Sequence, residues 1–211
     1  MSAVLLSAGI PSADARGDAV RPFYPGDILA ATSSTVEAVL RSGADLVFGG
    51  HPTISPVVLQ LAALLDAGEQ VHVWQSEVFA SSITDEVRRL VTEHRAHLHM
   101  VAGEDGRDAS LGSMRAAMIG AHDLAAAFFV GGMDGIAVEL ELLAGRTPRV
   151  PFFAFVTPGG MAGRVARDRA LPTDALPAPD ADARGRGLVG RAYGSLALSA
   201  LDDVGLHARE R

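Results

Sequence analysis

The sequence predicts a single α/β domain, a Rossmann-like doubly wound parallel sheet with helices on both faces. The first observation is that short apolar segments typical of buried strands alternate with segments of helical apolar spacing. The second is that glycine pairs follow several expected strands, at the sheet edge where parallel α/β folds bind ligands. Alternation of this kind implies right-handed β–α–β units. The 211 residues suit one domain with a sizeable core.

The first half of the chain contains four expected strands. Residues 4–7 form a short buried strand, and residues 8–32 are expected to be irregular because they are rich in proline and glycine. The capping box Ser34-x-x-Glu37 predicts that a helix opens there and runs to about Arg41. Apolar spacing then predicts strands at 45–48, 71–75 and 97–102, and helices at 54–67 and 84–94.

The second half repeats the alternation and then changes character. A helix, a strand and a helix are predicted at 109–122, 125–130 and 135–144, and a sixth strand at 152–156 precedes another helix. We therefore expect one α/β domain over 1–170, a flexible Pro/Ala/Asp-rich loop over 171–187, and a C-terminal helix over 188–211. This last helix packs on the same domain or on a partner subunit.

Three glycine pairs fall at expected strand ends, namely Gly49-Gly50, Gly131-Gly132 and Gly159-Gly160. A single pair of this kind often makes only a turn or a close helix contact. Their recurrence at one sheet edge favours a ligand crevice. None of them fits Gly-x-Gly-x-x-Gly or the Walker pattern, which disfavours an ordinary dinucleotide dehydrogenase or kinase.

The stretch from Arg115 to Glu139 is the most informative part of the chain. Arg115 lies on the helix before the strand 125–130, and the backbone amides of the following helix start face an anion. We expect Arg115 and these amides to hold phosphate, and Glu139 to contact ribose hydroxyls. An exposed helix arginine and a solvated carboxylate are the ordinary alternatives. The segment between the glycine pair and Glu139 adds the ligand-binding candidates Met133, Asp134 and Gly135.

Further ligand-binding candidates follow other expected strands. Ser7 and Gly9 follow the first strand, where a small hydroxyl suits phosphate or ribose but a turn explains it equally well. His51 follows a glycine pair at a possible crevice mouth. Ser110 precedes Arg115 and either caps that helix or contacts the ligand.

No metal site and no cofactor are predicted. His94, His97 and His99 are close in sequence, and the last two share a face if they lie on a strand. No carboxylate pattern or further ligand accompanies them, so a metal site is disfavoured. The absence of cysteine excludes disulfides and thiolate ligands.

Composition restricts the partners. The net charge of −7 argues against nucleic acid but allows a small anionic ligand, because local arginines and helix ends set the potential. The N-terminus opens into an apolar strand without a basic leader, and no apolar run reaches the ~18 residues of a membrane span. We therefore expect a cytoplasmic protein with no membrane partner.

The stretch around Arg115 and Glu139 resembles the SLOG superfamily, which includes the LONELY GUY phosphoribohydrolases. Their motif is a helix arginine followed, after a strand, by Pro-Gly-Gly-x-Gly-Thr-x-x-Glu. Arg115 lies at the family's usual distance from the glycine pair, and Glu139 matches if one residue is inserted near Met133-Asp134. Val130 replaces the proline, and Gly135-Ile136 replaces Gly-Thr, so the threonine hydroxyl that donates to phosphate is missing.

A second match is the segment Leu46–His51, which is similar to the family's glycine-rich turn. The resemblance covers roughly residues 3 to 168 and is strongest to the SLOG branch found beside TIR and other effector domains in bacterial conflict systems. It implies sensing of a nucleotide-derived ligand such as ADP-ribose or an NAD relative. The alternative is hydrolysis of a nucleoside 5′-monophosphate at its N-glycosidic bond, with Arg115 and Glu139 catalytic. A structural dimerisation domain with a vestigial crevice is a third possibility. The resemblance also implies a homo-oligomer, and an effector protein or domain as partner.

Overall fold

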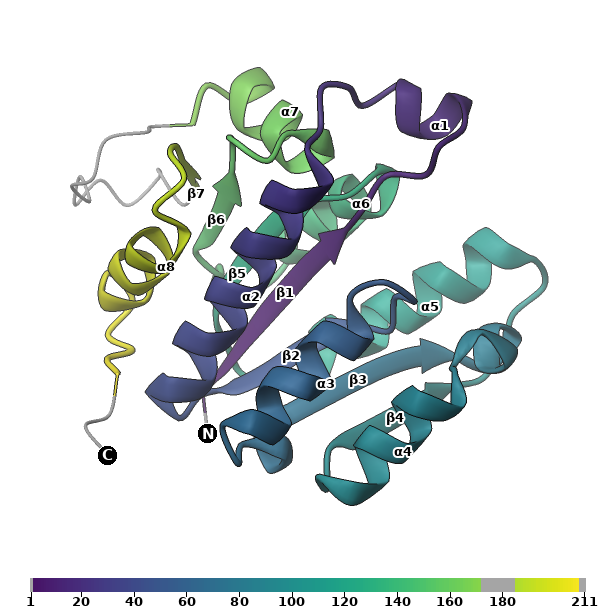
Figure 1. The fold of residues 1–211 in the computed structure, drawn as a ribbon. Coiled ribbons are helices and arrows are strands. Elements are labelled where there is room, and N and C mark those ends of the chain that lie inside the picture. Colours follow the sequence, from purple (N-terminus) through teal and green to yellow (C-terminus); the bar gives the residue numbers. More distant parts are fainter. Residues whose placement is uncertain (1, 172–184, 209–211) are drawn as a thin grey trace.

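The computed structural model describes residues 2–171 and 185–208, and within them seven strands form one sheet (Figure 1). The strand order is β4-β3-β2-β1-β5-β6-β7, and every neighbouring pair is parallel. The predicted Rossmann-like α/β fold is thereby confirmed. The strands are β1 (Ala3–Gly9), β2 (Asp45–Gly49), β3 (Val71–Ser76), β4 (His97–Val101), β5 (Leu124–Gly131), β6 (Phe152–Phe155) and β7 (Gly185–Leu188).

Helices cover both faces of the sheet (Figure 1). Side chains of each strand alternate between the two faces, so Val4 and Leu6 join one apolar core while Leu5 joins the other. The first core includes α2 (Pro25–Ser42), α3 (Ser55–Leu64), α4 (Asp85–Glu93) and α8 (Tyr193–Asp202). The second includes α5 (Arg107–Gly120), α6 (Asp134–Ala144) and α7 (Gly160–Asp168). Shorter elements are α1 (Ala15–Asp18) and the 3-10 segments η1 (Gly68–Gln70) and η2 (Glu77–Ser82).

None of the helices in residues 2–171 and 185–208 has both the length and the apolar character that crossing a bilayer requires. The longest, α2, has a mixed surface with a buried face and an exposed one. Its buried face packs on the sheet and belongs to the first core.

Helix α2 begins earlier than the sequence indicated. It starts at Pro25, so the stretch from Ser34 to Glu37 lies inside the helix and is not a capping box, and that prediction was wrong. A proline at the first helical position suits a helix start, because its missing N–H needs no partner there. The face that includes Ile28 is buried in the core. The Thr35 hydroxyl donates to a carbonyl one turn earlier, which satisfies it inside the helix.

The C-terminal part also differs from the prediction. Most of the expected loop 171–187 lies outside the described residues, but residues 185–187 belong to β7, which pairs with β6. This strand lacks apolar alternation, because its sequence is Gly-Arg-Gly-Leu. The expected terminal helix begins at Tyr193 and ends at Asp202. It packs on the same domain, where Tyr193 and Leu201 join the core that includes α2.

The strand order places the switch of winding direction between β1 and β5. From β1 the chain adds β2, β3 and β4 on one side, and it then returns to add β5, β6 and β7 on the other. In parallel α/β sheets the loops after two such strands diverge and leave a crevice at their carboxyl ends.

Candidate functional site

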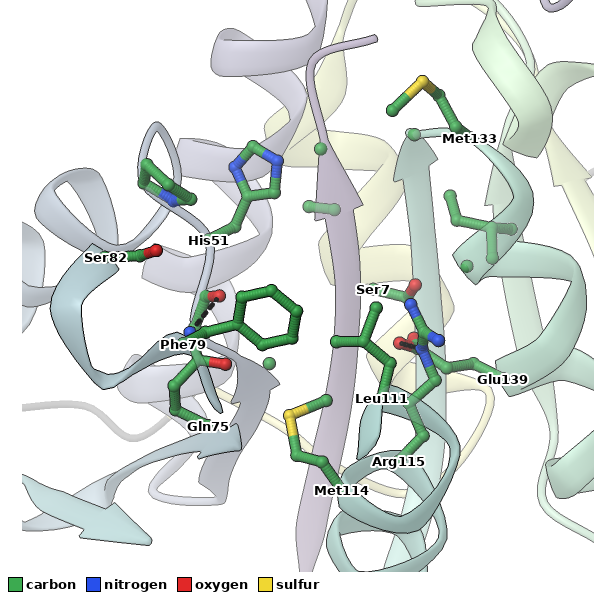
Figure 2. Close-up of a pocket in the computed structure, with 18 of the residues that line it drawn as sticks. Ser7, His51, Gln75, Phe79, Ser82, Leu111, Met114, Arg115, Met133 and Glu139 are labelled. Atoms are coloured by element: carbon green, nitrogen blue, oxygen red, sulfur yellow. Dashed lines mark hydrogen bonds and ion pairs between the residues drawn. The ribbon is translucent and has the colours of Figure 1, made fainter. Parts of the chain in front are cut away.

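A cavity of about 430 Å³ opens at the carboxyl ends of β1, β2 and β3, beside α5 and α6 (Figure 2). It occupies the predicted position beside the β1–β5 switch point. Most of the site residues expected from the sequence line it, namely Ser7, Gly9, Gly49, Gly50, His51, Arg115, Gly132, Met133, Gly135 and Glu139.

Arg115 and Glu139 form an ion pair inside this cavity. Arg115 projects from α5 and Glu139 from α6, and Arg115 Nε donates to Glu139 Oε1 over 3.1 Å. Their side chains are only 17% and 10% exposed. Because Arg115 binds through Nε, its two terminal amino groups remain for other acceptors.

Burial makes the Glu139 carboxyl a weaker acid than an exposed glutamate. Removal from water raises its pKa above the ordinary value, while a hydrogen bond with Ser7 and the positive charge of Arg115 lower it and only partly offset that rise. The carboxyl therefore holds a proton more readily than an exposed glutamate. A group of this kind can act as a general acid, or as an acceptor for sugar hydroxyls when ionised.

Gly135 makes room for the arginine. A Cβ at this position would lie 2.5 Å from Arg115 Nη2 and 3.3 Å from Arg115 Cζ. The absence of a side chain at the second residue of α6 therefore allows the guanidinium to lie across the start of that helix. This gives a physical reason for glycine at the position where the SLOG motif also has one.

The start of α6 presents backbone donors to the cavity. Met133 is the N-cap residue, and no side chain caps the helix. The first amides of a helix have no partner within it, and the helix dipole adds positive potential there. Gly131 and Gly132 lead into this turn with φ values of +62° and +66°, which residues with side chains rarely adopt. Gly132 N donates to Gly9 O over 2.6 Å and ties this turn to β1.

His51 contributes a further hydrogen-bond donor to the cavity. Its Nδ1 accepts a hydrogen bond from the Thr53 amide at 3.3 Å and lies 2.9 Å from the Thr53 hydroxyl. Burial lowers the pKa of His51, so the neutral ring is favoured. With Nδ1 as acceptor, the proton of the neutral ring lies on Nε2. That Nε2 is 3.7 Å from the position of a Cβ on Gly9, so its N–H faces the end of β1.

The sequence did not identify the apolar wall of the cavity. Phe79, from η2, points into the cavity on the side opposite Ser7, and Met114 of α5 lies nearby (Figure 2). Arg107 lies with its Cζ 5.8 Å from the centre of the Phe79 ring. Arg16 also lines the cavity. The only sequence signal for Phe79 was its place shortly after the expected third strand, because an isolated aromatic residue has no motif.

Five predicted residues lie outside the lining, namely Ser110, Gly131, Asp134, Gly159 and Gly160. The Ser110 hydroxyl is buried and donates to the carbonyls of Glu104 and Gly106, so it holds the turn before α5. Gly160 allows close backbone approach, because a Cβ there would lie 2.7 Å from the carbonyl carbon of Gly131. The third glycine pair therefore packs against the backbone of the Gly131 turn, outside the cavity lining.

Gly159 packs against Pro22, and its φ of +75° favours glycine. Asp134 begins α6 with an exposed side chain. A negative charge in the first turn stabilises a helix through its dipole.

Comparison with known proteins gives a family assignment. A model of the SLOG cluster3 family matches residues 25–180, which is more than half of the chain and includes Arg115 and Glu139. The chain therefore belongs to the SLOG cluster3 family. No curated protein matches it significantly. The matched range begins after β1, so the family model does not cover Ser7 and Gly9, which the sequence proposed and the structure places in the lining.

Proposed function

We propose that this member of the SLOG cluster3 family binds a nucleoside phosphate or a related nucleotide, such as ADP-ribose or an NAD derivative, and acts as its sensor. One observation carries the proposal: a single cavity of about 430 Å³ contains anion-binding groups together with an aromatic side chain. Its size is within the ~300–1,000 Å³ of ordinary small-molecule sites. Three arginines and one carboxylate line it, so it is locally positive in a chain of net charge −7.

The phosphate group is assigned to the side of the cavity formed by α6 and the end of β1. The amides at the start of α6, the terminal amino groups of Arg115 and the Nε2–H of His51 all donate, and none of these groups is negatively charged. Arg16 adds positive charge to the same lining.

The base is assigned to the apolar wall. Phe79 offers a ring face, and Leu111 and Met114 supply apolar contacts. Between the two sides lie Ser7 and Glu139, whose oxygens can bind ribose hydroxyls. The cavity thus has complementary groups for each chemical part of a nucleotide.

In this proposal the nucleotide is a signal that an effector protein or domain reads, and the sensor assembles as a homo-oligomer. The resemblance to SLOG domains found beside effectors supports the effector partner, and the resemblance to LONELY GUY enzymes supports the homo-oligomer.

A second function, hydrolysis of the N-glycosidic bond of a nucleoside 5′-monophosphate, is favoured by the raised pKa of Glu139. A protonated carboxyl beside the ribose can give its proton to the departing base, while water supplies the hydroxyl to the sugar. The ionised form instead stabilises positive charge that develops at the anomeric carbon.

Binding is tested by calorimetry and thermal shift with adenosine, ribose 5-phosphate, AMP, NAD and ADP-ribose. The phosphate assignment predicts that AMP binds at least about tenfold more tightly than adenosine, because a charged hydrogen bond contributes ~1.5–3 kcal/mol. Equal affinity for AMP and adenosine would exclude the phosphate assignment. No binding of any of the five compounds would reject nucleotide sensing.

Chromatography distinguishes the sensor from the hydrolase. The unmodified protein and Glu139→Gln are incubated with AMP or NAD, and free base is measured. A sensor releases none. A release of adenine from AMP that Glu139→Gln abolishes, with little change in AMP affinity, would establish the enzyme in its place.

A further inference from the structure

Four of the seven histidines gather near the amino ends of β3 and β4, away from the crevice. The register places His72 beside His97 and Trp74 beside His99. Alternate residues of a strand point to the same face, so the rings of the three strand histidines and of Trp74 share the face that α5 covers. His122, in the bend after α5, completes the cluster, and its ring lies edge-on to that of His72 at 4.8 Å.

Three of these rings present nitrogen atoms to one another. His72 Nδ1 and His99 Nε2 are 3.0 Å apart, and one ring nitrogen from each of His72, His99 and His122 lies within 4.8 Å of the others. In a tetrahedral site with metal–nitrogen bonds of ~2.0–2.1 Å, ligand nitrogens are about 3.4 Å apart. The first pair is about 0.4 Å closer than this separation, and the third ring needs to move by at most about 1.4 Å.

We propose that His72, His99 and His122 bind a divalent transition-metal ion of the zinc class. Imidazole nitrogens suit Zn²⁺, Ni²⁺ and Cu²⁺, while Mg²⁺ and Ca²⁺ require oxygen ligands. Three histidines with a fourth position open to water form a known zinc donor set. One of the two facing nitrogens, His72 Nδ1 or His99 Nε2, carries the proton of the hydrogen bond between the rings. When the ion binds between these two nitrogens, that proton moves to the other nitrogen of the same ring.

The surroundings of the cluster support this donor set. Asp45 Oδ2 is 3.9 Å from His72 Nε2, the nitrogen that faces away from His99, and a carboxylate there favours the tautomer that leaves Nδ1 free for a metal ion. Arg146 donates to the carbonyls of Ile119 and His122 and so fixes the bend that carries His122.

His97 has another role. Its ring stacks on that of His72 at 4.6 Å, and its Nε2 lies 3.1 Å from the Glu69 carbonyl. It therefore forms a wall of the site. A bound ion would join β3 and the edge strand β4 to the bend before β5, which clamps the sheet at the end opposite the crevice. The site is accordingly independent of nucleotide binding.

Trp74, the only tryptophan, reports on this site directly. Its ring stacks on His99 at 4.4 Å, and its Nε1–H donates to His122 Nε2 over 3.2 Å. This bond must break when His122 becomes a ligand, because a neutral imidazole has one lone pair for either the indole or the ion. The experiment titrates Zn²⁺ and Co²⁺ into the full chain, without a polyhistidine tag, and follows Trp74 emission, Co²⁺ absorption and melting temperature. The variants are His99→Gln and His122→Gln, with His207→Gln as the control because His207 is exposed and bonded to Asp202.

We expect Zn²⁺ to shift Trp74 emission and to raise the melting temperature, and Co²⁺ to give the strong visible absorption of a tetrahedral site. His99→Gln and His122→Gln should each lose more than about tenfold in affinity, while His207→Gln binds as the unmodified protein does. His122→Gln lies in a bend and keeps the test valid if the strand variant fails to fold. Absence of any response to Zn²⁺ and Co²⁺, or unchanged affinity in both cluster variants, would overturn the proposal.

Discussion

Substituting Gly135→Ala should weaken ligand binding through the position of Arg115. The added Cβ would lie 2.5 Å from Arg115 Nη2, whereas non-bonded heavy atoms rest at roughly 3.5 Å. The guanidinium must therefore move by about 1 Å. A shift away from Glu139 would lengthen the bond between Arg115 Nε and Glu139 Oε1, now 3.1 Å, to as much as ~4 Å, beyond hydrogen-bond distance.

The magnitude follows from the groups that are displaced. A hydrogen bond to a charged group contributes ~1.5–3 kcal/mol, so loss of one such bond between Arg115 and phosphate weakens AMP binding by roughly 10- to 150-fold. The helix itself gains, because alanine is better than glycine in a helix by ~0.8–1.0 kcal/mol and Gly135 has no positive φ. This gain offsets only part of the ~1.5–3 kcal/mol lost with the Arg115–Glu139 bond, so we expect the free energy of unfolding to fall by no more than about 2 kcal/mol.

The matched control is Gly112→Ala on α5, where a Cβ would meet nothing within 4 Å. This variant should gain the same helix stability and keep full AMP affinity. Calorimetry with AMP and urea denaturation measure the two effects, and the NMR signal of the Arg115 Nε–H reports the ion pair without any ligand. Unchanged AMP affinity and an unchanged Nε–H signal in Gly135→Ala would refute the reasoning.

The remaining predictions concern the aromatic wall, the buried charge and the supporting glycine. Phe79→Ala should weaken AMP binding by roughly tenfold or more but leave the affinity for ribose 5-phosphate unchanged, as calorimetry can measure, since base stacking contributes ~1–3 kcal/mol. The pKa of Glu139 is higher in the folded than in the unfolded chain, so the stability of the unmodified protein should fall as pH rises above 4.5 through the folded-state pKa. Urea denaturation across this range should show that Glu139→Gln removes the fall, and a rise of stability with pH that depends on Glu139 would contradict it. Arg115→Ala should lose more stability at about pH 8 than at about pH 5, because an unpaired buried carboxylate is costly only when ionised. Gly160→Ala should destabilise by more than ~2 kcal/mol, because its Cβ meets the Gly131 backbone, while Gly26→Ala on α2 has open space and should change little.

The sequence predicted the layers of the fold because each strand and helix has its own periodic signal. Apolar runs such as 125–130 are buried in any parallel sheet, and the structure places this run in β5, beside the central strand β1. It did not predict the start of α2 at Pro25. The cap signal at Ser34 is a local pattern, whereas the helical state of the preceding turns depends on their packing against the rest of the domain. Nor did it predict β7, whose strand state depends on pairing with β6.

Some residues of the candidate site could likewise be predicted from the sequence, and others could not. Arg115 and Glu139 were found because a helix, a strand and a helix in sequence bring their ends together at a known edge. Phe79 was missed because nothing local distinguishes an aromatic residue that points into a cavity from one that packs in a core. The histidine cluster was missed for a related reason: His72 and His122 lie far from His99 in sequence, and the β3–β4 register and the end of α5 bring them together.

The ion pair of Arg115 and Glu139 serves both proposed functions through the same electrostatics. Glu139 holds Arg115 by Nε and leaves its terminal amino groups available to an anion. A phosphate bound there would offset the positive charge that now lowers the pKa of Glu139, so that pKa would rise further and the carboxyl would hold a proton more readily. In a sensor this proton only removes a repulsion between the carboxylate and the ligand. In a hydrolase it is the proton that a departing base needs. The two functions therefore differ in the distance from the Glu139 carboxyl to the glycosidic bond, which is set by how deeply the base enters the wall formed by Phe79.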